Sequence, residues 1–419
     1  MVFLRQSDMP LPHRVVILGA GFGGLQTYLT LRRAKRKDIA VTIINKTNYF
    51  LFTPLLHEVA TGGLGHHNVV EAVREIIGKD SASFLQTEVS DIDMENRVVH
   101  TTARDVPYDT LVIGTGAKTA FYGIPGAAEY GYVLKNLGDA ISLRNRVIDL
   151  FEQANQRTPA ERKKLLAFAV VGGGATGVEI ATELADLFND TFQQFYANDF
   201  KQKEVSLTLV SADAELLMPF HPNIRRKALK ILQREGISVK LKMQVKEVTP
   251  DGLAFANGST LAAATVVWAA GVTPELTPPQ GMTCDKSKRL MVDEFLRADG
   301  HKFVFGLGDA ACSMDADGKP LPMLAQVAVQ QGTMVAYNIL RTLDKKPLTP
   351  FAFKMKGQLV SLGRFQAAAQ IGPFHFSGPL AWFIWRAVYF FNFPSWSKRF
   401  KIGADWFVNL FFPRDITRA

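Results

Sequence analysis

Through the first three hundred residues the chain alternates short, wholly apolar runs with longer stretches whose apolar residues recur every three or four positions. Runs such as Val15–Leu18 and Phe168–Val171 hold no polar residue, which is typical of strands buried on both faces of a parallel sheet. The stretch DAISLRNRVIDLFEQANQ, residues 139–156, has the spacing of an amphipathic helix. This alternation predicts a doubly wound α/β fold.

The pattern changes in the last seventy residues, which read LAWFIWRAVYFFNFPSWSKRFKIGADWFVNLFFPR from Leu380 onward. A membrane-spanning helix needs about 20 mostly apolar residues, and the run Leu380–Phe393 is too short and contains Arg386. Tryptophans with a basic cluster are typical of helices at a membrane interface. The same composition also suits a dimer interface or a packed cap, and more than one of these roles can hold. The residues concerned are Trp382, Trp385, Trp396, Trp406, Lys398, Arg399 and Lys401.

Composition narrows the class of protein. With 419 residues, of which 47% are hydrophobic, the chain is long enough for two or three domains. The net charge of +9 comes with no nucleic-acid-binding motif, so we expect no nucleic-acid partner. Cys284 and Cys312 lack metal-ligand spacing, which predicts no metal site, no disulfide framework and a reducing compartment. The segment Met1–Arg14 lacks the apolar core of a secretion signal, which predicts a cytoplasmic start.

Two glycine-rich turns carry the strongest chemical signal. VVILGAGFGG places Gly19, Gly21 and Gly24 in G-x-G-x-x-G spacing directly after an apolar run, and AVVGGGATGVE repeats the spacing with Gly172, Gly174 and Gly177. LVIGTG and VVWAAG then follow at nearly equal intervals: Gly114 stands 95 residues after Gly19, and Ala269 stands 97 residues after Gly172. One such turn is a weak signal, but two with matching partner strands predict two dinucleotide sites.

The chemistry of this turn explains why glycines are needed. The first glycine permits the bend, the second lets the backbone approach a pyrophosphate, and the third lets helix and strand pack closely. The pyrophosphate then meets free N–H groups at the positive end of a helix. A chain that holds two dinucleotides most simply transfers a hydride between them, typically from a nicotinamide to a flavin.

Four segments together resemble the type II NADH dehydrogenases, which are non-proton-pumping NADH:quinone oxidoreductases of respiratory membranes. They are NKTNYFLFTPLLHEVATG, VVGGGATGVEIATELA, GLGDAA and AQVAVQQG. The resemblance covers nearly the whole chain and implies two Rossmann-like domains arranged as in glutathione reductase, with FAD in the first and NADH in the second. It further implies a monotopic homodimer on the cytoplasmic face of the cell membrane, in contact with lipids. Hydride would pass from NADH to FAD, and two electrons would then pass to ubiquinone or menaquinone.

The same comparison gives domain boundaries. HKFVFGLGDAA, after the second unit, is predicted to return to the first sheet and make the first domain discontinuous. We expect the FAD-binding domain at 1–119 and 299–346, the NAD(P)H-binding domain at 120–298, and the membrane-association region at 347–419.

Most candidate cofactor residues follow from the turns and from the resemblance. Asn45 and Lys46 end the second strand where an acidic ribose partner is usual, and an amide can also bind a ribose hydroxyl. Asp309 resembles the carboxylate that holds the ribityl chain, although it can also serve only as a helix cap. The remaining FAD candidates are Gly19, Ala20, Gly21, Phe22, Gly23, Gly24, Val89, Gly114, Gly116, Ala325 and Lys401, with Thr53 and Pro54 as less specific neighbours. The NADH candidates are Gly172, Gly174, Gly177, Ser211 and Gly271.

Three further residues are candidates for the reaction itself. Gln326 and Gln330 are four apart and would share one face of a helix, where neutral amides can donate to quinone carbonyls. Glu179 follows the third glycine of the second turn, and we expect it in the first turn of a helix, with Glu183 one turn on. A carboxylate there is favoured by the helix dipole alone, whereas the resemblance implies that Glu179 orients nicotinamide or handles protons for quinone.

Ser211 is a departure from the family pattern. It ends the strand VSLTLV, where an NADH-selective protein usually carries Glu or Asp. A carboxylate at this position accepts both ribose hydroxyls and repels a 2′-phosphate. Its replacement by serine predicts weaker discrimination between NADH and NADPH.

The same scaffold also serves other functions. Disulfide reductases and sulfide:quinone oxidoreductases need redox cysteines near the flavin, and Cys284 and Cys312 do not match. A soluble NAD(P)H-dependent flavoprotein reductase that passes electrons to a small iron–sulfur protein is the main alternative, because it needs no aromatic, basic tail. A non-catalytic NADH sensor or scaffold is the other alternative. The presence of Glu179 and AQVAVQQG argues against it, because such a protein would need neither.

Overall fold

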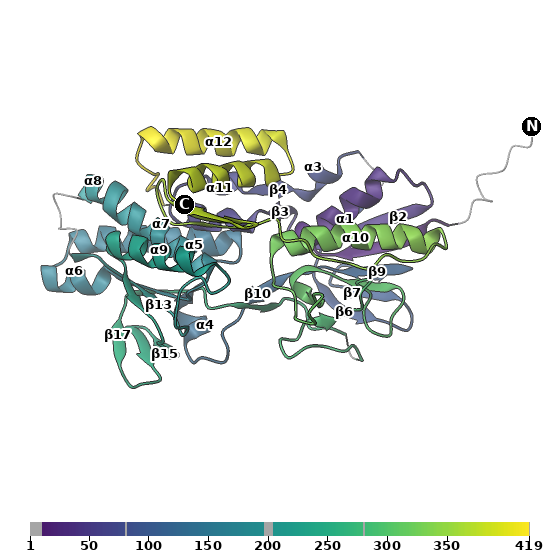
Figure 1. Cartoon of the computed structure of the whole chain (residues 1–419), viewed down its shortest axis with the longest axis horizontal. Helices are drawn as coiled ribbons and strands as arrows, with labels where there is room; N and C mark the ends of the chain where they lie inside the picture. The colour runs from purple at the N-terminus through teal and green to yellow at the C-terminus, as the bar shows by residue number, and fades with distance from the viewer. Residues whose placement is uncertain (1–10, 80–81, 197–203, 280, 419) are drawn as a thin grey trace, which may run out of the picture. The chain divides into compact units, whose positions relative to one another are not determined.

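The structure is a computed structural model that describes residues 11–79, 82–196, 204–279 and 281–418 (Figure 1). Met1–Pro10, within the segment from which a cytoplasmic start is predicted, lie outside the described residues. The chain forms two compact units, and each is discontinuous. Unit 1 takes its described residues from Met1–Phe50, Glu71–Lys118 and Val272–Lys354, and unit 2 takes them from Leu51–Val70, Thr119–Gly271 and Met355–Ala419.

Unit 1 is built on a parallel sheet with the strand order β21-β9-β1-β2-β5. The strand that leads into the first glycine turn, β1 (His13–Leu18), is central and fully buried over Val15–Leu18. The other strands of this sheet are β2 (Ile39–Asn45), β5 (Ser83–Gln86), β9 (Thr110–Ile113) and β21 (Val304–Gly306).

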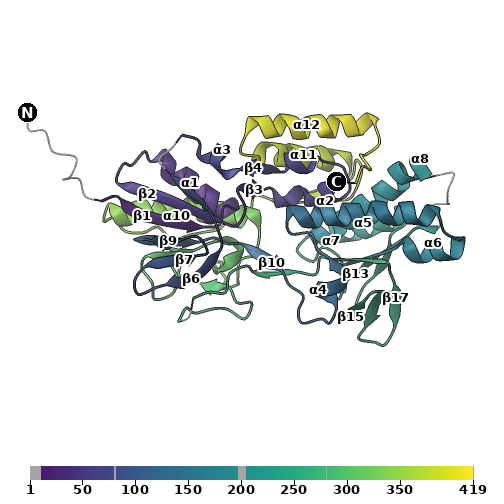
Figure 2. The same ribbon diagram turned by 180° about the vertical axis from the view of Figure 1, so that it is seen from behind.

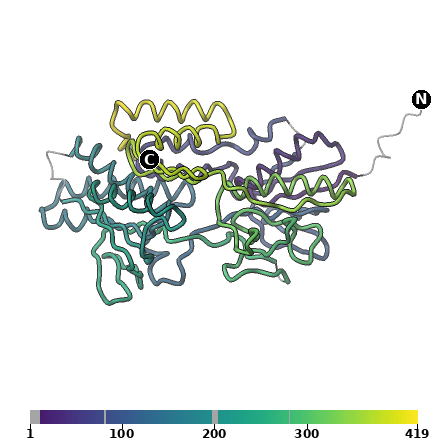
Figure 3. The backbone as a smooth tube through the Cα atoms, in the orientation of Figure 1, coloured from purple at the N-terminus to yellow at the C-terminus, as the bar shows by residue number. Residues whose placement is uncertain are grey.

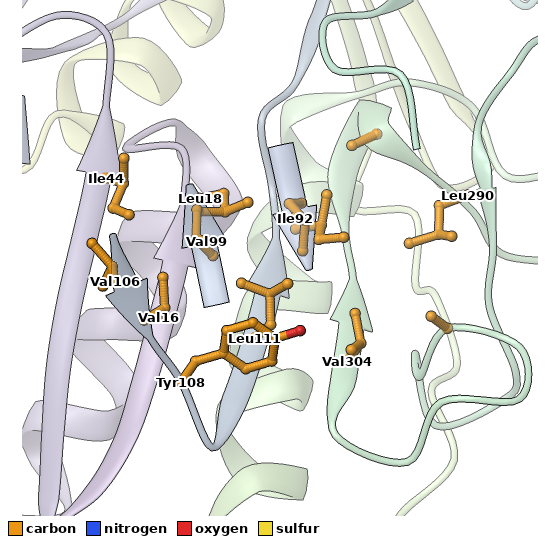
Figure 4. Close-up of a cluster of buried hydrophobic side chains, with 13 residues drawn as sticks. Val16, Leu18, Ile44, Ile92, Val99, Val106, Tyr108, Leu111, Leu290 and Val304 are labelled. Carbon is orange, nitrogen blue, oxygen red and sulfur yellow. The ribbon is translucent and has the colours of Figure 1, made fainter. Parts of the chain in front are cut away.

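An antiparallel sheet covers one face of the parallel sheet in unit 1. It consists of β6 (Val89–Asp93), β7 (Val98–Thr101) and β8 (Val106–Pro107). Figure 4 shows Ile92 and Val99 of this sheet in the same buried cluster as Leu18, Leu111 and Val304 of the parallel sheet.

Two long helices, α1 (Phe22–Arg33) and α10 (Ala325–Leu343), lie side by side in unit 1 (Figures 1 and 2). A Cβ added at Gly332 of α10 would stand 2.3 Å from the carbonyl oxygen of Gly23, so only glycine allows this close crossing. The smaller elements of unit 1, or at its borders, are β3 (Tyr49–Leu51), β4 (Val70–Ala72), α3 (Val73–Ile77), β10 (Ala117–Thr119), β19 (Val272–Pro274), β20 (Leu290–Met291), the 3₁₀ turn η6 (Gly308–Ala310) and β22 (Ala311–Cys312).

Unit 2 repeats this architecture. Its parallel sheet has the order β11-β18-β12-β13-β14, with the strand that leads into the second glycine turn, β12 (Ala167–Val171), again central. The VVWAAG strand, β18 (Thr265–Trp268), pairs with β12 as β9 pairs with β1. The other members are β11 (Gly131–Tyr132), β13 (Ser206–Val210) and β14 (Ser238–Lys240), and the antiparallel cover is β15 (Val245–Thr249), β16 (Gly252–Phe255) and β17 (Thr260–Ala262).

The helices of unit 2 include two that pack against its parallel sheet, α5 (Leu137–Asn155) and α7 (Ala175–Asp186). Helix α7 runs directly into one turn of π-helix, η4 (Leu187–Phe192). The remaining elements before the C-terminal region are η2 (Thr53–Leu55), α2 (Leu56–Ala60), η3 (His66–Asn68), α4 (Ala127–Tyr130), α6 (Pro159–Leu165), α8 (Gln193–Tyr196) and α9 (Pro222–Arg234).

The C-terminal region of unit 2 consists of a small antiparallel sheet and two helices. The sheet contains β23 (Gln358–Ser361), β24 (Ala367–Ile371) and β25 (Phe374–Ser377). The helices α11 (Pro379–Asn392) and α12 (Trp396–Phe411) follow and lie side by side, as the yellow end of the tube in Figure 3 shows. Among the described residues, no helix has the length and apolar character that crossing a bilayer demands.

The predicted α/β class and the two Rossmann-like units are confirmed, and HKFVFGLGDAA does return to the first sheet as β21. The unit borders differ from those expected from the sequence. Residues 272–298 cluster with unit 1, whereas 51–70 cluster with unit 2. The expected membrane-association region, 347–419, is divided at Lys354, and its larger part lies within unit 2.

Candidate functional site

The two glycine turns have the same packing, position by position. A Cβ added at Gly24 would stand 1.9 Å from the carbonyl oxygen of Gly19, and one added at Gly177 would stand 1.9 Å from that of Gly172. Gly19 and Gly172 both have positive φ, and their hypothetical Cβ atoms would each lie 2.3 Å from a carbonyl oxygen on the neighbouring strand. Side chains at Gly24 and Gly177 would therefore force the helix away from the turn, and side chains at Gly19 and Gly172 would collide with the backbone that follows the neighbouring strand.

The middle glycine of each turn is different, because it faces open space. No atom lies within 4 Å of a Cβ added at Gly21 or Gly174. Each is the N-cap of its helix, α1 or α7, and neither cap is satisfied by a side chain. Free N–H groups beside an open surface are what a pyrophosphate requires, so both turns fit a dinucleotide.

Asn45 stabilises the first turn by hydrogen bonding. Its Oδ1 accepts a hydrogen bond from the Ala20 N–H at 3.0 Å, and its Nδ2 donates to the Thr47 carbonyl at 2.8 Å. Lys46 forms an ion pair with Glu275 at 2.9 Å. Val89, at the start of β6, is half-buried. Their contacts with FAD stay predictions.

Asp309 lies in η6, beyond the carboxyl end of β21 and in the same unit as the first turn. The cap residue of η6 is Leu307, so Asp309 is not the N-cap considered from the sequence. Gln331, which the sequence did not single out, supports this turn. Its Oε1 accepts the Gly308 N–H at 2.7 Å, and its Nε2 donates to Ser313 Oγ at 2.7 Å.

Helix α10 begins at Ala325, so Gln326 and Gln330 share a helix face as predicted. Both are half-buried. The Gln330 amide is engaged twice by the backbone of Lys354, donating to its carbonyl at 3.0 Å and accepting from its N–H at 3.1 Å. Contact with quinone stays a prediction for both residues. Gln330 would have to give up its two hydrogen bonds with Lys354 in order to bind quinone.

Ser211 lies against the second turn. It follows β13 directly and is buried, and a Cβ added at Gly173 would stand 2.5 Å from Ser211 Oγ. Its hydroxyl accepts a hydrogen bond from the Asp213 N–H at 3.2 Å. Neither Ser211 nor Ala212 carries a carboxylate, and the first acidic residue after β13 is Asp213.

Substitution Ser211→Glu is expected to raise the NADH-to-NADPH ratio of kcat/KM by about tenfold or more, since the new carboxylate would repel a 2′-phosphate. Steady-state kinetics with both donors measure the ratio. Ser206→Glu, at the exposed opposite end of the same strand, is the control and should leave the ratio unchanged. Equal ratios in the two variants would contradict the role of Ser211.

The structure corrects the expected position of Glu179. Helix α7 begins at Ala175, so the third glycine lies inside the helix and Glu179 lies beyond its first turn. The helix dipole therefore does not account for this carboxylate. Glu179 is instead buried, and its Oε1 accepts the Ser361 N–H at 3.1 Å.

Glu179 belongs to a buried cluster of ionisable groups in unit 2, most of which the sequence analysis missed. Glu179 Oε2 lies 3.9 Å from His57 Nδ1. One turn further along α7, Glu183 Oε2 pairs with Arg414 Nη1 at 2.7 Å and accepts from Thr61 Oγ1 at 3.2 Å. The available signal was the acidic spacing of Glu179, Glu183 and Asp186 on one helix, together with the His-Glu pair of α2; nothing in the sequence indicated Arg414.

Burial controls the protonation of this cluster. It raises the pKa of Glu179 to about 8 and that of Asp186 to about 8, and the charge of Glu183 adds to both effects. Burial also raises the pKa of Glu58 to about 7 and lowers that of His57 to about 4. Burial works against ionisation of Glu183 too, but the nearby Arg414 and His57 bring its pKa below the ordinary value. Glu183 is thus the charged member, whereas Glu179 holds its proton at neutral pH.

The remaining candidates lie on different units. Gly114 and Gly116 follow β9 in unit 1, whereas Gly271 ends the central part of unit 2. Thr53 and Pro54 form η2 of unit 2, and Lys401 is exposed on α12 of the same unit. Roles at the flavin stay predictions for all of these residues.

Helices α11 and α12 expose phenylalanines rather than the tryptophans expected at a membrane interface. Trp382, Trp385 and Trp406 are buried, and only Trp396 of this group is exposed. The expectation that these tryptophans anchor the surface is therefore wrong for three of them. The exposed large apolar residues of the two helices and their end are Leu380, Phe383, Val388, Phe391, Trp396, Phe400, Phe407, Val408, Phe411 and Phe412.

Neither a metal site nor a redox disulfide is present in the part of the chain that the structure describes. No group of three His, Cys, Asp or Glu residues there could hold a metal ion. Cys284 is exposed, Cys312 is buried, and both are free thiols.

Comparisons with known proteins place this geometry in a family. Residues 13–332 match the family model for pyridine nucleotide-disulphide oxidoreductases, and residues 355–415 match that for the NDH2 C-terminal domain. A probable NADH dehydrogenase of Dictyostelium discoideum is 32% identical over 96% of this chain and 91% of the relative. A type II NADH:quinone oxidoreductase of Mycobacterium tuberculosis is 31% identical over 96% of this chain and 89% of the relative.

The fold agrees with this placement. The structure of NDH2 from Plasmodium falciparum in complex with NADH superposes with a TM-score of 0.88 at 22% identity, covering 97% of this chain and 99% of that one. The C-terminal match is the more specific finding, because the wider group also contains disulfide reductases whose cysteine pair this chain lacks. The chain therefore belongs to the type II NADH dehydrogenases.

Proposed function

We propose that this protein oxidises NADH and reduces a membrane quinone, with FAD held at the first glycine turn and NADH at the second. The repeated turn carries the proposal, because each copy combines an open, uncapped helix start with glycines that no side chain can replace. The names of the relatives from Dictyostelium and Mycobacterium support the activity. When bound, FAD supplies the two-electron chemistry that links donor and acceptor.

The protein's own residues bind and orient the two dinucleotides and supply a proton. The N–H groups that begin α1 and α7 would hold the two pyrophosphates, and Asn45 fixes the first turn through Ala20. Reduction of a quinone to a quinol consumes two electrons and two protons. NADH supplies a hydride, so one further proton must come from solution, and a carboxyl that keeps its proton at neutral pH can deliver it. We propose Glu179 for this role, with orientation of nicotinamide as the alternative.

A two-step spectroscopic experiment tests the function. Under anaerobic conditions, NADH should bleach the flavin absorbance of the purified protein, and a ubiquinone or menaquinone analogue should restore it. A small iron–sulfur protein in place of quinone tests the soluble reductase, which is disfavoured because residues 355–415 match the NDH2 C-terminal domain. Flavin that stays oxidised with NADH, or stays reduced with either quinone, would overturn the proposal.

Substitution Glu179→Gln is expected to abolish the fall in the rate of quinone reduction at alkaline pH. In the unmodified protein the rate should fall as pH rises through about 8, where Glu179 loses its proton; the variant should be slower below this pH and show no fall there. Rates of flavin reoxidation by quinone between about pH 6 and about pH 10 measure the effect. Glu247→Gln, at an exposed site of unit 2, is the control. A defect confined to reduction by NADH would instead assign Glu179 to nicotinamide orientation.

We also propose that α11 and α12 attach the protein to the cytoplasmic face of the cell membrane, where it meets quinone and lipid, and that the protein is a homodimer. The exposed phenylalanines of these helices, near Lys398, Arg399 and Lys401, support the attachment. The oligomeric state is measured by light scattering in detergent.

Paired substitutions Phe400→Glu and Phe407→Glu are expected to release the protein from anionic vesicles, because two charges would enter the apolar face. Vesicle flotation measures binding. Phe195→Glu, at another exposed phenylalanine of unit 2, is the control and should still float with vesicles. Unchanged flotation of the paired variant would contradict attachment through this face.

A further inference from the structure

Unit 2 contains a cavity of about 510 Å³ that the predicted cofactor sites do not use. It is lined by the π-helical turn η4, the β23–β24 turn, helices α11 and α12 and the segment that ends at Arg414. Neither Glu179 nor any glycine of the second turn lines it. Its volume is in the range of pockets that bind small molecules, and π-helical turns frequently occur at functional sites.

Arg386 of α11 lines this cavity, and its guanidinium group has unusual surroundings. Its guanidinium carbon lies 4.2 Å from the ring centroid of Trp382 and 4.5 Å from that of Trp406, so two indoles hold the charged group in place. The Nε and Nη1 atoms are buried, and neither has a hydrogen-bond partner among the described residues. A buried donor on a charged group that is left without an acceptor is unfavourable, so a ligand that accepts from it is stabilised.

The acidic neighbours of Arg386 are engaged elsewhere. Glu58 Oε2 accepts the Trp406 indole N–H at 2.6 Å, and Glu183 pairs with Arg414. Asp190, which also lines the cavity, pairs with Arg364 at 3.1 Å. Arg386 interacts electrostatically with Glu58 and Glu183, but among the described residues no carboxylate accepts a hydrogen bond from its Nε or Nη1. A guanidinium presents parallel N–H donors that suit the two oxygens of a carboxylate or phosphate.

The other lining residues include both apolar and polar side chains. Leu410, Phe411 and Phe412 are three consecutive apolar residues of the wall, here called the apolar strip, and the amide side chains of Asn189 and Gln194 also line the cavity. An apolar strip in the same cavity as a fixed cation suits a molecule with an acidic head and an apolar chain. We propose that this cavity binds an anionic amphiphile, with its carboxylate or phosphate on Arg386 and its chain along Leu410–Phe412.

Tryptophan fluorescence reports on such binding, because Trp382 and Trp406 flank the proposed head group. The flavin-loaded protein is titrated with a brominated fatty acid below its critical micelle concentration, and bromine quenches nearby indoles. We expect saturable quenching that unlabelled fatty acid reverses. Arg386→Gln should weaken binding by about tenfold or more, since a charge-assisted pair contributes at least about 1.4 kcal/mol.

A matched pair of surface variants tests the proposal independently if Arg386→Gln fails to fold. Phe412 lines the cavity and is 64% exposed, whereas Phe374 of β25 does not line it and is 69% exposed. Phe412→Glu should repel the ligand, and Phe374→Glu should bind it normally. Equal weakening in both variants, unchanged binding in Arg386→Gln, or quenching that never saturates would overturn the proposal.

Two further titrations identify the source of the acidic head. Vesicles of brominated phosphatidylglycerol test a lipid head group, and inorganic phosphate tests a free anion as competitor. Quenching by the fatty acid alone, with the dependence on Phe412 and Arg386, assigns a carboxylate amphiphile. Quenching by the vesicles with the same dependence assigns a phospholipid. Displacement of the fatty acid by millimolar phosphate would show that the apolar strip contributes nothing, and the amphiphile would be wrong.

Discussion

Substitution Gly21→Ala is expected to yield folded protein without flavin, and Gly174→Ala is expected to yield yellow protein that binds NADH more weakly. Both glycines adopt extended conformations that alanine accepts, with φ of −81° and −76°. No protein atom lies within 4 Å of either added Cβ. The methyl group would therefore meet only the pyrophosphate, and the cost would fall on binding rather than on folding.

The size of the effect follows from the close approach that each turn requires. A methyl group between backbone and pyrophosphate costs hydrogen bonds to an anion, and every 1.4 kcal/mol lost is about a tenfold loss of affinity. Flavin content by absorbance is expected to fall to near zero in Gly21→Ala. In Gly174→Ala the KM for NADH should rise by about tenfold or more.

Each variant is the control for the other. Circular dichroism should show unchanged secondary structure in both. Loss of flavin in Gly174→Ala with normal flavin in Gly21→Ala would reverse the assignment of the two sites. Normal flavin content and normal KM in both variants would contradict the proposal that these turns bind dinucleotides.

Substitution Arg414→Met is expected to destabilise the protein by about 3–5 kcal/mol, because it leaves the charge of Glu183 buried and unpaired. Arg414 Nη1 lies 2.7 Å from Glu183 Oε2, and its Nη2 lies 3.8 Å from Asp186 Oδ2. In the unmodified protein the lowered pKa of Glu183 contributes stability above its ordinary pKa, and this contribution is lost as pH falls through the lowered value. The difference between the two proteins should therefore shrink in acid, where Glu183 is neutral in both.

Urea unfolding at neutral and acidic pH measures this difference. Arg418→Met removes a neighbouring arginine whose pair with Asp149, at 3.4 Å, is on the surface, and it should cost less than about 1 kcal/mol. The double substitution Arg414→Met with Glu183→Met should recover most of the loss, since it removes both charges together. A single variant as stable as Arg418→Met would show that the buried pair contributes little.

The parallel sheets and both cofactor turns could be predicted because their signals are local. Val15–Leu18 and Phe168–Val171 are apolar runs that end at glycines, and both proved to be central strands. The matched spacing to Gly114 and Ala269 identified the strands that became β9 and β18. Periodicity could not place 51–70 in unit 2, because its short helices and turns pack against distant helices such as α5 and α7.

The buried cluster around Glu179 could not be predicted in the same way. It joins residues from α2, α7 and the last residues of the chain, and the contact between Glu183 and Arg414 spans more than half the sequence. Glu179 itself was found through its motif, but its environment was misjudged because the helix begins before the third glycine. The tryptophans of α11 and α12 were misjudged because composition does not tell which face of a helix is buried.

The repeated crossing of the chain between units has a consequence for biosynthesis. Unit 1 acquires β21, an edge strand of its sheet, only at Val304–Gly306, and α10, the helix beside α1, only at Ala325–Leu343. On the ribosome, β1, β2, β5 and β9 emerge long before these late partners, with apolar surface still uncovered. Nascent chains that stall in the middle third of translation should therefore recruit chaperones and be cleaved readily by proteases.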